Sequence, residues 1–248
     1  MQPLPRPQGG GTTVLLRKLI NIGDDHNWIL FASWLVAALR TRGPFPILIL
    51  QGEQGSAKST MARFLRRIID PSTALVRSPP QNERDLVIAA SNSWVICYDN
   101  LSSSQPWFSD ALCRLATGGE FTTRELYTNS EEVFFDAQRP VVLNGIDHLA
   151  ERPDLADRAL ILHLPTIESQ DRRDEEQLCS NFDRDLPLIL GALCSAVSSA
   201  LARIDDVRLD HKPRMADFAK LSAAAEHGLG FPAGAFMDAY RGNRVPAG

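Results

Sequence analysis

The stretch from Ile47 to Thr60, ILILQGEQGSAKST, constrains the fold of this chain more than any other part of it. It opens with four aliphatic residues, Ile47 to Leu50, which is typical of a strand buried on both faces. A turn containing Gly52 and Gly55 follows, and from Lys58 onward the apolar residues recur at helical spacing. A strand, a glycine-bearing loop and a helix in this order predict an α/β fold.

The same stretch matches the pattern of a phosphate-binding loop (P-loop), G-x-x-x-x-G-K-[ST], except that Ala57 replaces its second glycine. Alanine is the smallest replacement, although a positive φ at this position would disfavour it. We interpret it as a tolerated variant. Backbone N–H groups of such a loop and the positive end of the following helix can bind phosphate oxygens. The predicted nucleotide-binding residues are Gly52, Glu53, Gln54, Gly55, Ser56, Ala57, Lys58, Ser59 and Thr60.

The composition restricts the class of protein and its surroundings. The chain has 248 residues and a net charge of -4, so no global basic field indicates nucleic-acid binding. The four cysteines lie far apart without metal-ligand spacing, which favours free thiols in a reducing cytoplasm. Residues 1–12 are rich in proline and glycine and predict a disordered leader rather than a secretory signal. The apolar stretch 186–204 has helical spacing, so we expect a packed helix and no membrane span.

A second predicted strand, residues 74–77, is followed by a buried strand that ends at Asp99. We expect this buried strand to lie beside the P-loop strand, where Asp99 and the Ser59 hydroxyl would bind Mg²⁺. The alternative is an aspartate that only ends a strand at a turn. The next residue is Asn100, where many motor ATPases have a second acid that polarises the attacking water. Asparagine cannot take a proton, so Glu53 and Glu120 remain alternative carboxylates.

Residues 121–135 alternate around a polar tip, 128–130, which predicts a β-hairpin. The hairpin has two interpretations: an ordinary surface hairpin, or one that contacts nucleic acid in a pore. The tip carries no lysine or arginine, so a contact would rest on Arg124 or Tyr127.

Two more polar residues stand next to predicted buried strands. Asn144 ends the strand that begins at Val141, and Arg158 directly precedes a last apolar strand. An ordinary explanation for Arg158 is a salt bridge with Asp154 or Asp157.

Taken in order, these features resemble the core of the AAA+ ATPases. The segments GEQGSAKST, YDNLS, LYTNSEE, RPVVLNGI and LADRALILHLP are similar to the ATPase modules of phage and mobile-element primase–helicase proteins, which resemble superfamily-3 and minichromosome-maintenance motors. The resemblance covers roughly residues 30–220. It implies a P-loop NTPase fold, with a three-layer α/β/α core over residues 13–168 and a small C-terminal helical lid over residues 169–248.

The resemblance also implies roles for individual residues. Lys58, Ser59 and Asp99 would bind Mg²⁺ and ATP, and Asn144 would position the attacking water. Arg158 would act on the γ-phosphate held by a neighbouring subunit, which requires assembly into a ring, expected to be a hexamer.

One further arginine enters through the resemblance. Arg214, in the segment KPRMADF, matches a sensor-2 residue that would face the nucleotide of its own subunit. The alternative is an ordinary arginine at the start of a helix.

The leading functional hypothesis is a ring-forming, cytoplasmic motor ATPase that acts on DNA, preferably single-stranded, as a helicase or translocase module. The first alternative is a slowly hydrolysing switch or assembly ATPase, favoured by Asn100, the net acidity and the hairpin tip. A small-molecule kinase is disfavoured by the long chain after the P-loop, by Asn144 and by the Asp-Arg pair. The abrupt end of the chain suggests further domains in a longer parent protein.

Overall fold

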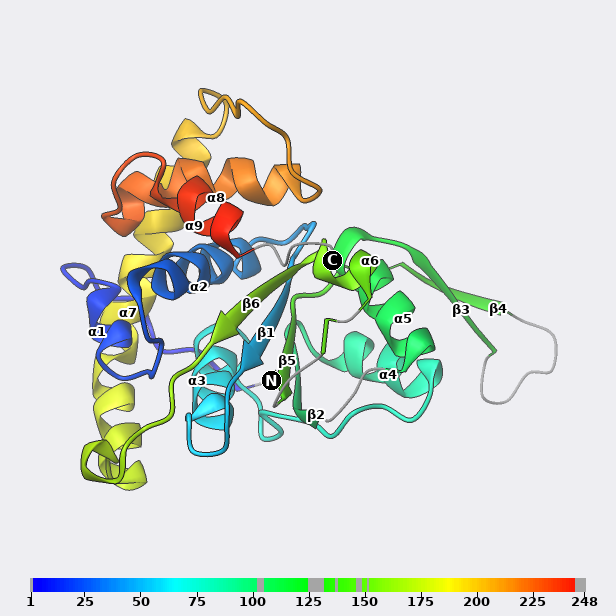
Figure 1. The fold of residues 1–248 in the computed structure, drawn as a ribbon, viewed down its shortest axis with the longest axis horizontal. Helices are drawn as coiled ribbons and strands as arrows, with labels where there is room; N and C mark the ends of the chain where they lie inside the picture. The colour runs from blue at the N-terminus through cyan, green and yellow to red at the C-terminus, as the bar shows by residue number, and fades with distance from the viewer. Residues whose placement is uncertain are drawn as a thin grey trace.

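The computed structural model describes residues 2–101, 105–124, 132–136, 138–145, 149–150 and 152–243. Its centre is a sheet of four parallel strands in the order β2-β5-β1-β6 (Figure 1). The strands of this sheet are β1 (Ile47–Gln51), β2 (Ile96–Leu101), β5 (Val141–Gly145) and β6 (Ala159–His163). The helices are α1 (Val14–Arg17), α2 (Asp25–Ala38), α3 (Lys58–Ile69), α4 (Glu83–Asn92), α5 (Pro106–Thr117), α6 (Pro153–Ala156), α7 (Glu175–Arg203), α8 (Ala216–Leu229) and α9 (Ala235–Gly242).

The predicted α/β fold is confirmed, with β1 as an inner strand of the parallel sheet. Leu48 of β1 lies level with Val142 of β5 on one side and with Leu160 of β6 on the other. Strands β1 and β5 are buried along their whole length, as expected for strands covered on both faces.

The neighbour of β1 differs from the prediction. Strand β2, which carries Asp99, pairs with β5, and β5 therefore lies between β2 and β1. The predicted strand at residues 74–77 is reduced to an isolated bridge between Arg77 and Tyr98. A single bridge fits a segment that ends in two prolines, which cannot donate hydrogen bonds to a strand ladder.

Alternate residues of the strands pack into two separate hydrophobic clusters, because side chains point to opposite faces along a strand. Leu48 and Leu50 belong to the cluster that contains α2, α3, α7, α8 and α9. Ile47 and Ile49 belong to the cluster that contains α4 and α5. Helices thus cover both faces of the sheet, which gives the three layers seen in Figure 1.

The C-terminal helices are part of the main core. Helices α7, α8 and α9 share one cluster of buried residues with α2 and α3, including Leu193, Phe218 and Phe236. The rings of Phe64 on α3 and Phe182 on α7 stack with centroids 4.1 Å apart. The segment expected to form a lid is therefore anchored on α2 and α3.

Helix α7 is, within the described parts of the chain, the one helix long and apolar enough to cross a membrane by composition alone. Its buried residues pack instead against α8 and the rest of the core.

Residues 1–12 were predicted as a disordered leader. In the structure, residues 2–12 form an extended segment that contacts other elements. The Gln2 amide donates to the Pro71 carbonyl over 2.8 Å, and the Gln8 amide donates to the Pro187 carbonyl over 2.9 Å. The Gln8 backbone can approach α7 closely because residue 191 is a glycine, since a Cβ atom there would collide with the Gln8 carbonyl. The composition predicted disorder because a proline- and glycine-rich segment has no hydrophobic pattern of its own. In the structure this segment contacts the rest of the protein through backbone hydrogen bonds.

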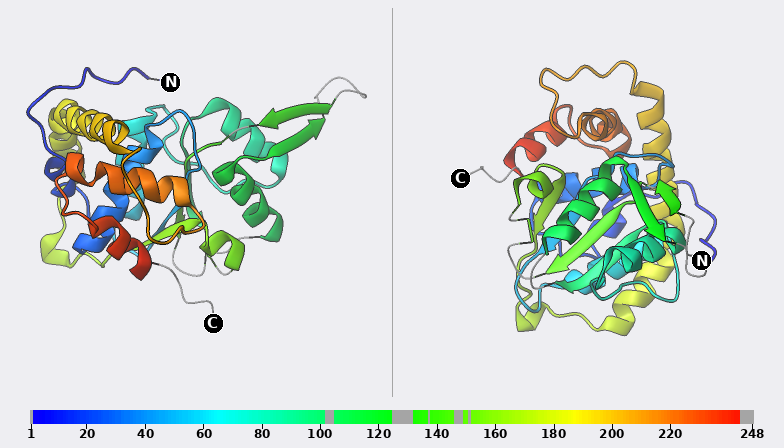
Figure 2. Two further views of the ribbon diagram at one scale, coloured as in Figure 1. Left: turned by 90° about the horizontal axis from the view of Figure 1, so that it is seen from above. Right: turned by 90° about the vertical axis from the view of Figure 1, so that its right-hand side faces the viewer.

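The predicted hairpin is confirmed as two antiparallel strands, β3 (Glu120–Arg124) and β4 (Glu132–Asp136). It projects away from the parallel sheet beyond α5 (Figures 1 and 2). The predicted tip at 128–130 lies outside the described residues.

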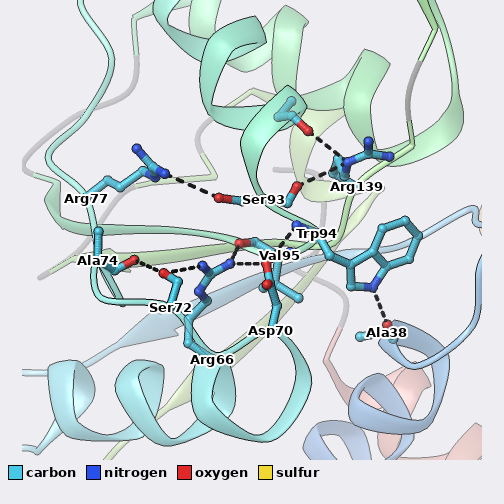
Figure 3. A network of polar contacts seen from close by, with 11 residues as sticks. Ala38, Arg66, Asp70, Ser72, Ala74, Arg77, Ser93, Trp94, Val95 and Arg139 are labelled. Carbon is cyan, nitrogen blue, oxygen red and sulfur yellow. Dashed lines mark hydrogen bonds and ion pairs between the residues drawn. The ribbon is translucent and has the colours of Figure 1, made fainter. Parts of the chain in front are cut away.

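A buried polar network ties the end of α3 to the start of β2 (Figure 3). Nη1 of Arg66 lies 2.6 Å from Oδ2 of Asp70, and the two side chains are only 2% and 3% exposed. Oδ2 of Asp70 also accepts hydrogen bonds from the amides of Trp94 (2.7 Å) and Val95 (3.1 Å). Arg66 donates in addition to the Val95 carbonyl and to Ser72. Because the pair sits among many hydrogen bonds, it fixes the position of β2 relative to α3.

Candidate functional site

Polar side chains from three separate elements meet at the carboxyl edge of the sheet. The Ser59 hydroxyl, in the first turn of α3, donates to Oδ1 of Asp99 on β2 over 3.1 Å. Nδ2 of Asn144 on β5 donates to the Ser59 hydroxyl over 3.2 Å and to Oδ1 of Asp99. The parallel strands bring these residues together, since their carboxyl ends lie at the same edge. Because β5 lies between β1 and β2, Asn144 can contact both Ser59 and Asp99.

Asp99 is held in one orientation by its neighbours. Its Oδ1 atom also accepts a hydrogen bond from the Asn100 amide over 2.9 Å. Within the described residues, no hydrogen bond reaches the other carboxylate oxygen. The carboxylate thus has an oxygen available for a ligand at the edge of an open cavity.

That cavity has a volume of about 670 Å³ and lies between the loop that follows β1 and the ends of β2 and β5. We call residues 52–57 the β1–α3 loop. The lining residues are Gln54, Gly55, Ser56, Ala57, Lys58, Ser59, Thr60, Asp99, Asn100, Asn144 and Gly145. Most of the residues singled out in the sequence therefore do line one cavity, at the N-terminal end of a helix, where backbone N–H groups favour anions.

Lys58 lies folded over the β1–α3 loop. Its ammonium donates to the carbonyls of Gly52 (2.6 Å) and Glu53 (2.8 Å) and to the Ser56 hydroxyl (3.2 Å). Gly52 is needed beneath this turn, because a Cβ atom there would lie 2.6 Å from the Leu164 carbonyl oxygen. A cation is thus held at the centre of the loop by carbonyl groups of the loop itself.

Two non-glycine residues of the cavity have left-handed backbone conformations. Ala57 has φ 60° and ψ 27°, so the glycine position of the pattern does require a positive φ here. An L-residue in this conformation costs about 1–2 kcal/mol. Asn100 has φ 59° and lies where the pairing of β2 with β5 shifts register. Asparagine is one of the few residues that tolerate this conformation, which gives a backbone reason for the residue at position 100.

The cavity contains few carboxylates. Asp99 is the only acidic residue of the described chain that lines it. Glu53 is exposed and does not line it, and the side chain of Glu120 lies outside the described part. Among the described residues there is no group of three or more His, Cys, Asp or Glu side chains that could hold a metal ion. Within the described residues, the cavity therefore offers a divalent cation one carboxylate, together with hydroxyl and amide oxygens.

This cavity is lined neither by Arg158, predicted to act on a neighbouring subunit's nucleotide, nor by Arg214, predicted to face its own. Arg158 precedes β6, at the end of the sheet opposite the cavity, and its Nη1 donates to the Asp154 carbonyl over 2.8 Å. The same atom lies 3.6 Å from the Asp154 carboxylate, and the side chain is 13% exposed. Arg214 is exposed just before α8 and lines neither this cavity nor the one described next. In Figure 1 the segment before α8 lies at the top, whereas β1 runs down toward α3.

A second cavity, of about 490 Å³, adjoins the first and shares Gly55, Ala57 and Thr60 with it. Its other lining residues are Leu19, Ile20, Asn21, Met61, Ile167, Asp171, Arg172, Arg173, Glu175 and Leu178. Asn21, Arg172 and Arg173 could not be found from the sequence, because no spacing rule links residues before α2 and after β6 to the β1–α3 loop.

The structure does not describe the side chains of the two hairpin residues predicted to contact nucleic acid. Arg124 ends β3, and only its backbone is described. Tyr127 lies outside the described residues.

Solved structures show the same fold. An apo structure of the NrS-1 C-terminal region is 14% identical, with a TM-score of 0.58, covering 92% of this chain and 55% of that one. An apo structure of its residues 305–718 is 12% identical, with a TM-score of 0.53, covering 99% of this chain and 56% of that one. The chain thus spans little more than half the length of these structures.

Sequence comparison finds no match among curated proteins. A family model does match, that of the actinomycete integrative conjugative element replication proteins, over residues 13–244. Because the match takes in nearly the whole sequence, this chain belongs to the family of actinomycete integrative conjugative element replication proteins.

Proposed function

We propose that this protein binds and hydrolyses ATP and works as an oligomeric motor in DNA replication, as a helicase or translocase module. The observation that carries the proposal is the meeting of Ser59, Asp99 and Asn144 beside the β1–α3 loop and Lys58. Membership of a replication family and a parallel α/β fold support the same assignment.

The residues present fit Mg²⁺ and a nucleoside triphosphate. Mg²⁺ is bound in such sites by one or two protein oxygens, with the remaining ligands supplied by water and phosphate. The Ser59 hydroxyl and the Asp99 carboxylate, 3.1 Å apart, would hold it. The bound ion would supply charge neutralisation for the phosphate oxygens.

Each polar residue then has a defined task. Lys58 would exchange the carbonyl oxygens of Gly52 and Glu53 for phosphate oxygens, which form stronger, charge-assisted hydrogen bonds. The amide of Asn144 would orient the attacking water, because it already lies between Asp99 and Ser59.

The proposed motor also needs a partner subunit. We propose that Arg158 acts on the site of a neighbouring copy in a ring, expected to be a hexamer. For this role its guanidinium has to leave the Asp154 carbonyl. Mixing Arg158→Ala protein with Lys58→Ala protein tests the idea, because a hybrid interface would join an intact loop to an intact arginine. Mixed oligomers without any recovered turnover would exclude a shared site.

A second function is favoured by one observation: Asp99 is the only carboxylate of the described chain in the cavity, and it is already the proposed metal ligand. Asn100 cannot accept a proton. A protein of this kind would hydrolyse ATP slowly and act as a nucleotide-dependent switch or assembly ATPase.

The proposed partners are single-stranded DNA and further copies of the chain, in the cytoplasm, with additional domains in a longer parent protein. The comparison structures are almost twice as long as the matched part, which is compatible with such domains.

The deciding experiment is steady-state phosphate release from ATP, measured with and without single-stranded DNA over a range of protein concentrations. We expect turnover that rises with DNA and with protein concentration, and that is lost in Lys58→Ala protein. Nucleotide binding with flat, near-zero turnover would support the switch instead. A wild-type protein that does not bind ATP in calorimetry would overturn both.

A further inference from the structure

The segment between β6 and α7 lies along the β1–α3 loop and is fixed to it at several points. The Leu164 amide donates to the Gln51 carbonyl over 2.8 Å, and the Ile167 amide donates to the Gly55 carbonyl over 3.3 Å. Nδ2 of Asn21 joins the two segments, since it lies 3.0 Å from the Ser56 carbonyl and 2.6 Å from the Pro165 carbonyl. The chain after β6 is therefore held as one wall of the second cavity.

Arg172 stands on this wall opposite the loop. A methyl group placed on the Cα atom of Gly55 would lie 3.8 Å from Nη2 of Arg172. Both residues line the second cavity, together with Ala57 and Thr60. Within the described residues, the exposed guanidinium of Arg172 has no hydrogen bond or ion pair.

Of the other charged residues of this wall, Arg173 and Glu175 have partners outside the β1–α3 loop, and Asp171 is a carboxylate that cannot bind phosphate. Arg173 donates to the Lys18 carbonyl over 2.6 Å, and Glu175 lies 3.1 Å from Nη1 of Arg63. Asp171 lines the cavity but forms no ion pair with a described residue, and it is exposed. Arg172 is thus the arginine of this wall whose donors remain available next to the loop.

Under the proposed function, the two cavities would hold different parts of the nucleotide. Asp99 and Asn144 line only the first cavity, so the metal and the terminal phosphate belong there under the proposed function. The second cavity meets the loop at Gly55, Ala57 and Thr60 and has aliphatic walls from Ile20, Met61 and Leu178. Base and ribose fit such walls, and the phosphates nearest the ribose then pass beside Arg172.

We propose that Arg172 binds the α- and β-phosphates of a nucleoside di- or triphosphate within its own subunit. The inference rests on the proposed nucleotide binding and adds a residue from a segment that the sequence did not single out. A guanidinium is suited to the role because its planar fork can donate two parallel hydrogen bonds to phosphate oxygens.

Calorimetry with Mg²⁺ and ATP, ADP or adenosine tests the proposal on wild-type, Arg172→Ala, Arg172→Lys and Arg84→Ala proteins. Arg84 is the matched control, an exposed arginine on α4 that lines neither cavity. We expect Arg172→Ala to weaken ATP and ADP equally, by about 10- to 100-fold, the scale of a hydrogen bond to a charged group. Adenosine affinity should not change, because adenosine has no phosphate, and Arg172→Lys should lose less affinity than Arg172→Ala.

Each other outcome overturns the proposal in a recognisable way. Loss of ATP affinity with intact ADP affinity would place Arg172 at the γ-phosphate. Unchanged affinities in Arg172→Ala, with wild-type binding intact, would make Arg172 an ordinary surface arginine while leaving the proposed function standing. A wild-type protein that binds no nucleotide would remove both proposals. Equal melting temperatures of the variants would exclude a folding defect.

Discussion

Helix α3 and strand β2 are joined by polar side chains at both of their ends, and the two junctions differ in kind. At one end, Arg66 and Asp70 are almost completely buried and surrounded by the chain segment from Trp94 to Val95 (Figure 3). At the other end, Ser59 and Asp99 meet at the edge of a large cavity, and one oxygen of Asp99 has no partner among the described residues. The first junction is buried and its carboxylate and both Nη atoms are bonded within the protein, although Nε of Arg66 has no partner, whereas the second leaves capacity for a ligand.

The comparison teaches how to separate a structural polar cluster from a functional one. Burying a charge is unfavourable unless it is paired and hydrogen-bonded. Removing one partner from a buried cluster should therefore destabilise the folded protein. Polar groups that stay at a cavity with unfilled positions are available to a ligand. Substitutions at the two junctions should therefore change different measurements.

The largest effect is expected from Asp70→Ala at the closed junction. The substitution leaves the Arg66 guanidinium buried without its carboxylate, which should lower the free energy of unfolding by about 3–5 kcal/mol. For a chain of this size, that loss lowers the melting temperature by roughly 6–20 °C. Thermal unfolding followed by circular dichroism measures it.

The matched control is Asp183→Ala, which removes the exposed partner of Arg67. A surface ion pair contributes only about 0–1 kcal/mol, so this protein should melt close to the wild type. If Asp70→Ala melts no lower than Asp183→Ala, the buried pair does not hold α3 to β2.

At the open junction, Asp99→Asn should reduce ATP turnover by about 10²- to 10³-fold, the cost of losing one group that stabilises developing charge. Nucleotide affinity and melting temperature should change much less, because the amide keeps the shape of the carboxylate. Phosphate release and calorimetry on the same preparation separate the two. Equal turnover at saturating Mg²⁺ would remove Asp99 from the catalytic site.

Lys58→Ala should weaken binding of Mg²⁺-ATP by about 1–3 kcal/mol, the contribution of charge-assisted hydrogen bonds to phosphate. Calorimetry measures the change, with Lys220→Ala as the control for loss of a lysine on α8, away from both cavities. An affinity equal to that of the wild type would contradict the assignment of the β1–α3 loop as a P-loop.

The smallest effect is expected from Ala57→Gly. Relief of the left-handed conformation, about 1–2 kcal/mol, is partly offset by the greater entropy of glycine in the unfolded chain. We expect a net stabilisation of about 0.5–1 kcal/mol, seen as a higher denaturation midpoint. Ala62→Gly, inside helix α3, should instead lower the free energy of unfolding by about 1 kcal/mol. A destabilised Ala57→Gly protein would show that the methyl group has a packing role.

Several parts of the fold and the site were predictable from local sequence. The aliphatic run before Gly52 indicated a buried strand, because strands covered on both faces lack alternation, and the glycine-bearing loop and helix after it indicated a parallel sheet. The polar residues Asp99 and Asn144 stood directly at strand ends, and parallel strands bring such ends to one edge. The alternation around residues 128–130 identified the hairpin strands.

Other features had no local signal. The docking of residues 2–12 depends on backbone hydrogen bonds to Pro71 and Pro187, which no composition rule predicts. Arg66 and Asp70 are four residues apart in the sequence and carry opposite charges, which does not reveal that they are buried. Only the tertiary structure places residues 94–95 against them. Arg158 and Arg214 were assigned roles by motif resemblance. In the structure Arg158 donates to the Asp154 carbonyl and Arg214 lines neither cavity, so a contact of either residue with a nucleotide stays a prediction.

By itself the sequence determined the parallel α/β core and the set of residues at its carboxyl edge, because short apolar runs predict both the buried strands and the residues at which they end. Tertiary structure decided the order β2-β5-β1-β6, the position of Arg172 beside Gly55, and which polar clusters are closed. These depend on contacts between residues far apart in the chain, whose free energies arise only when the elements pack together.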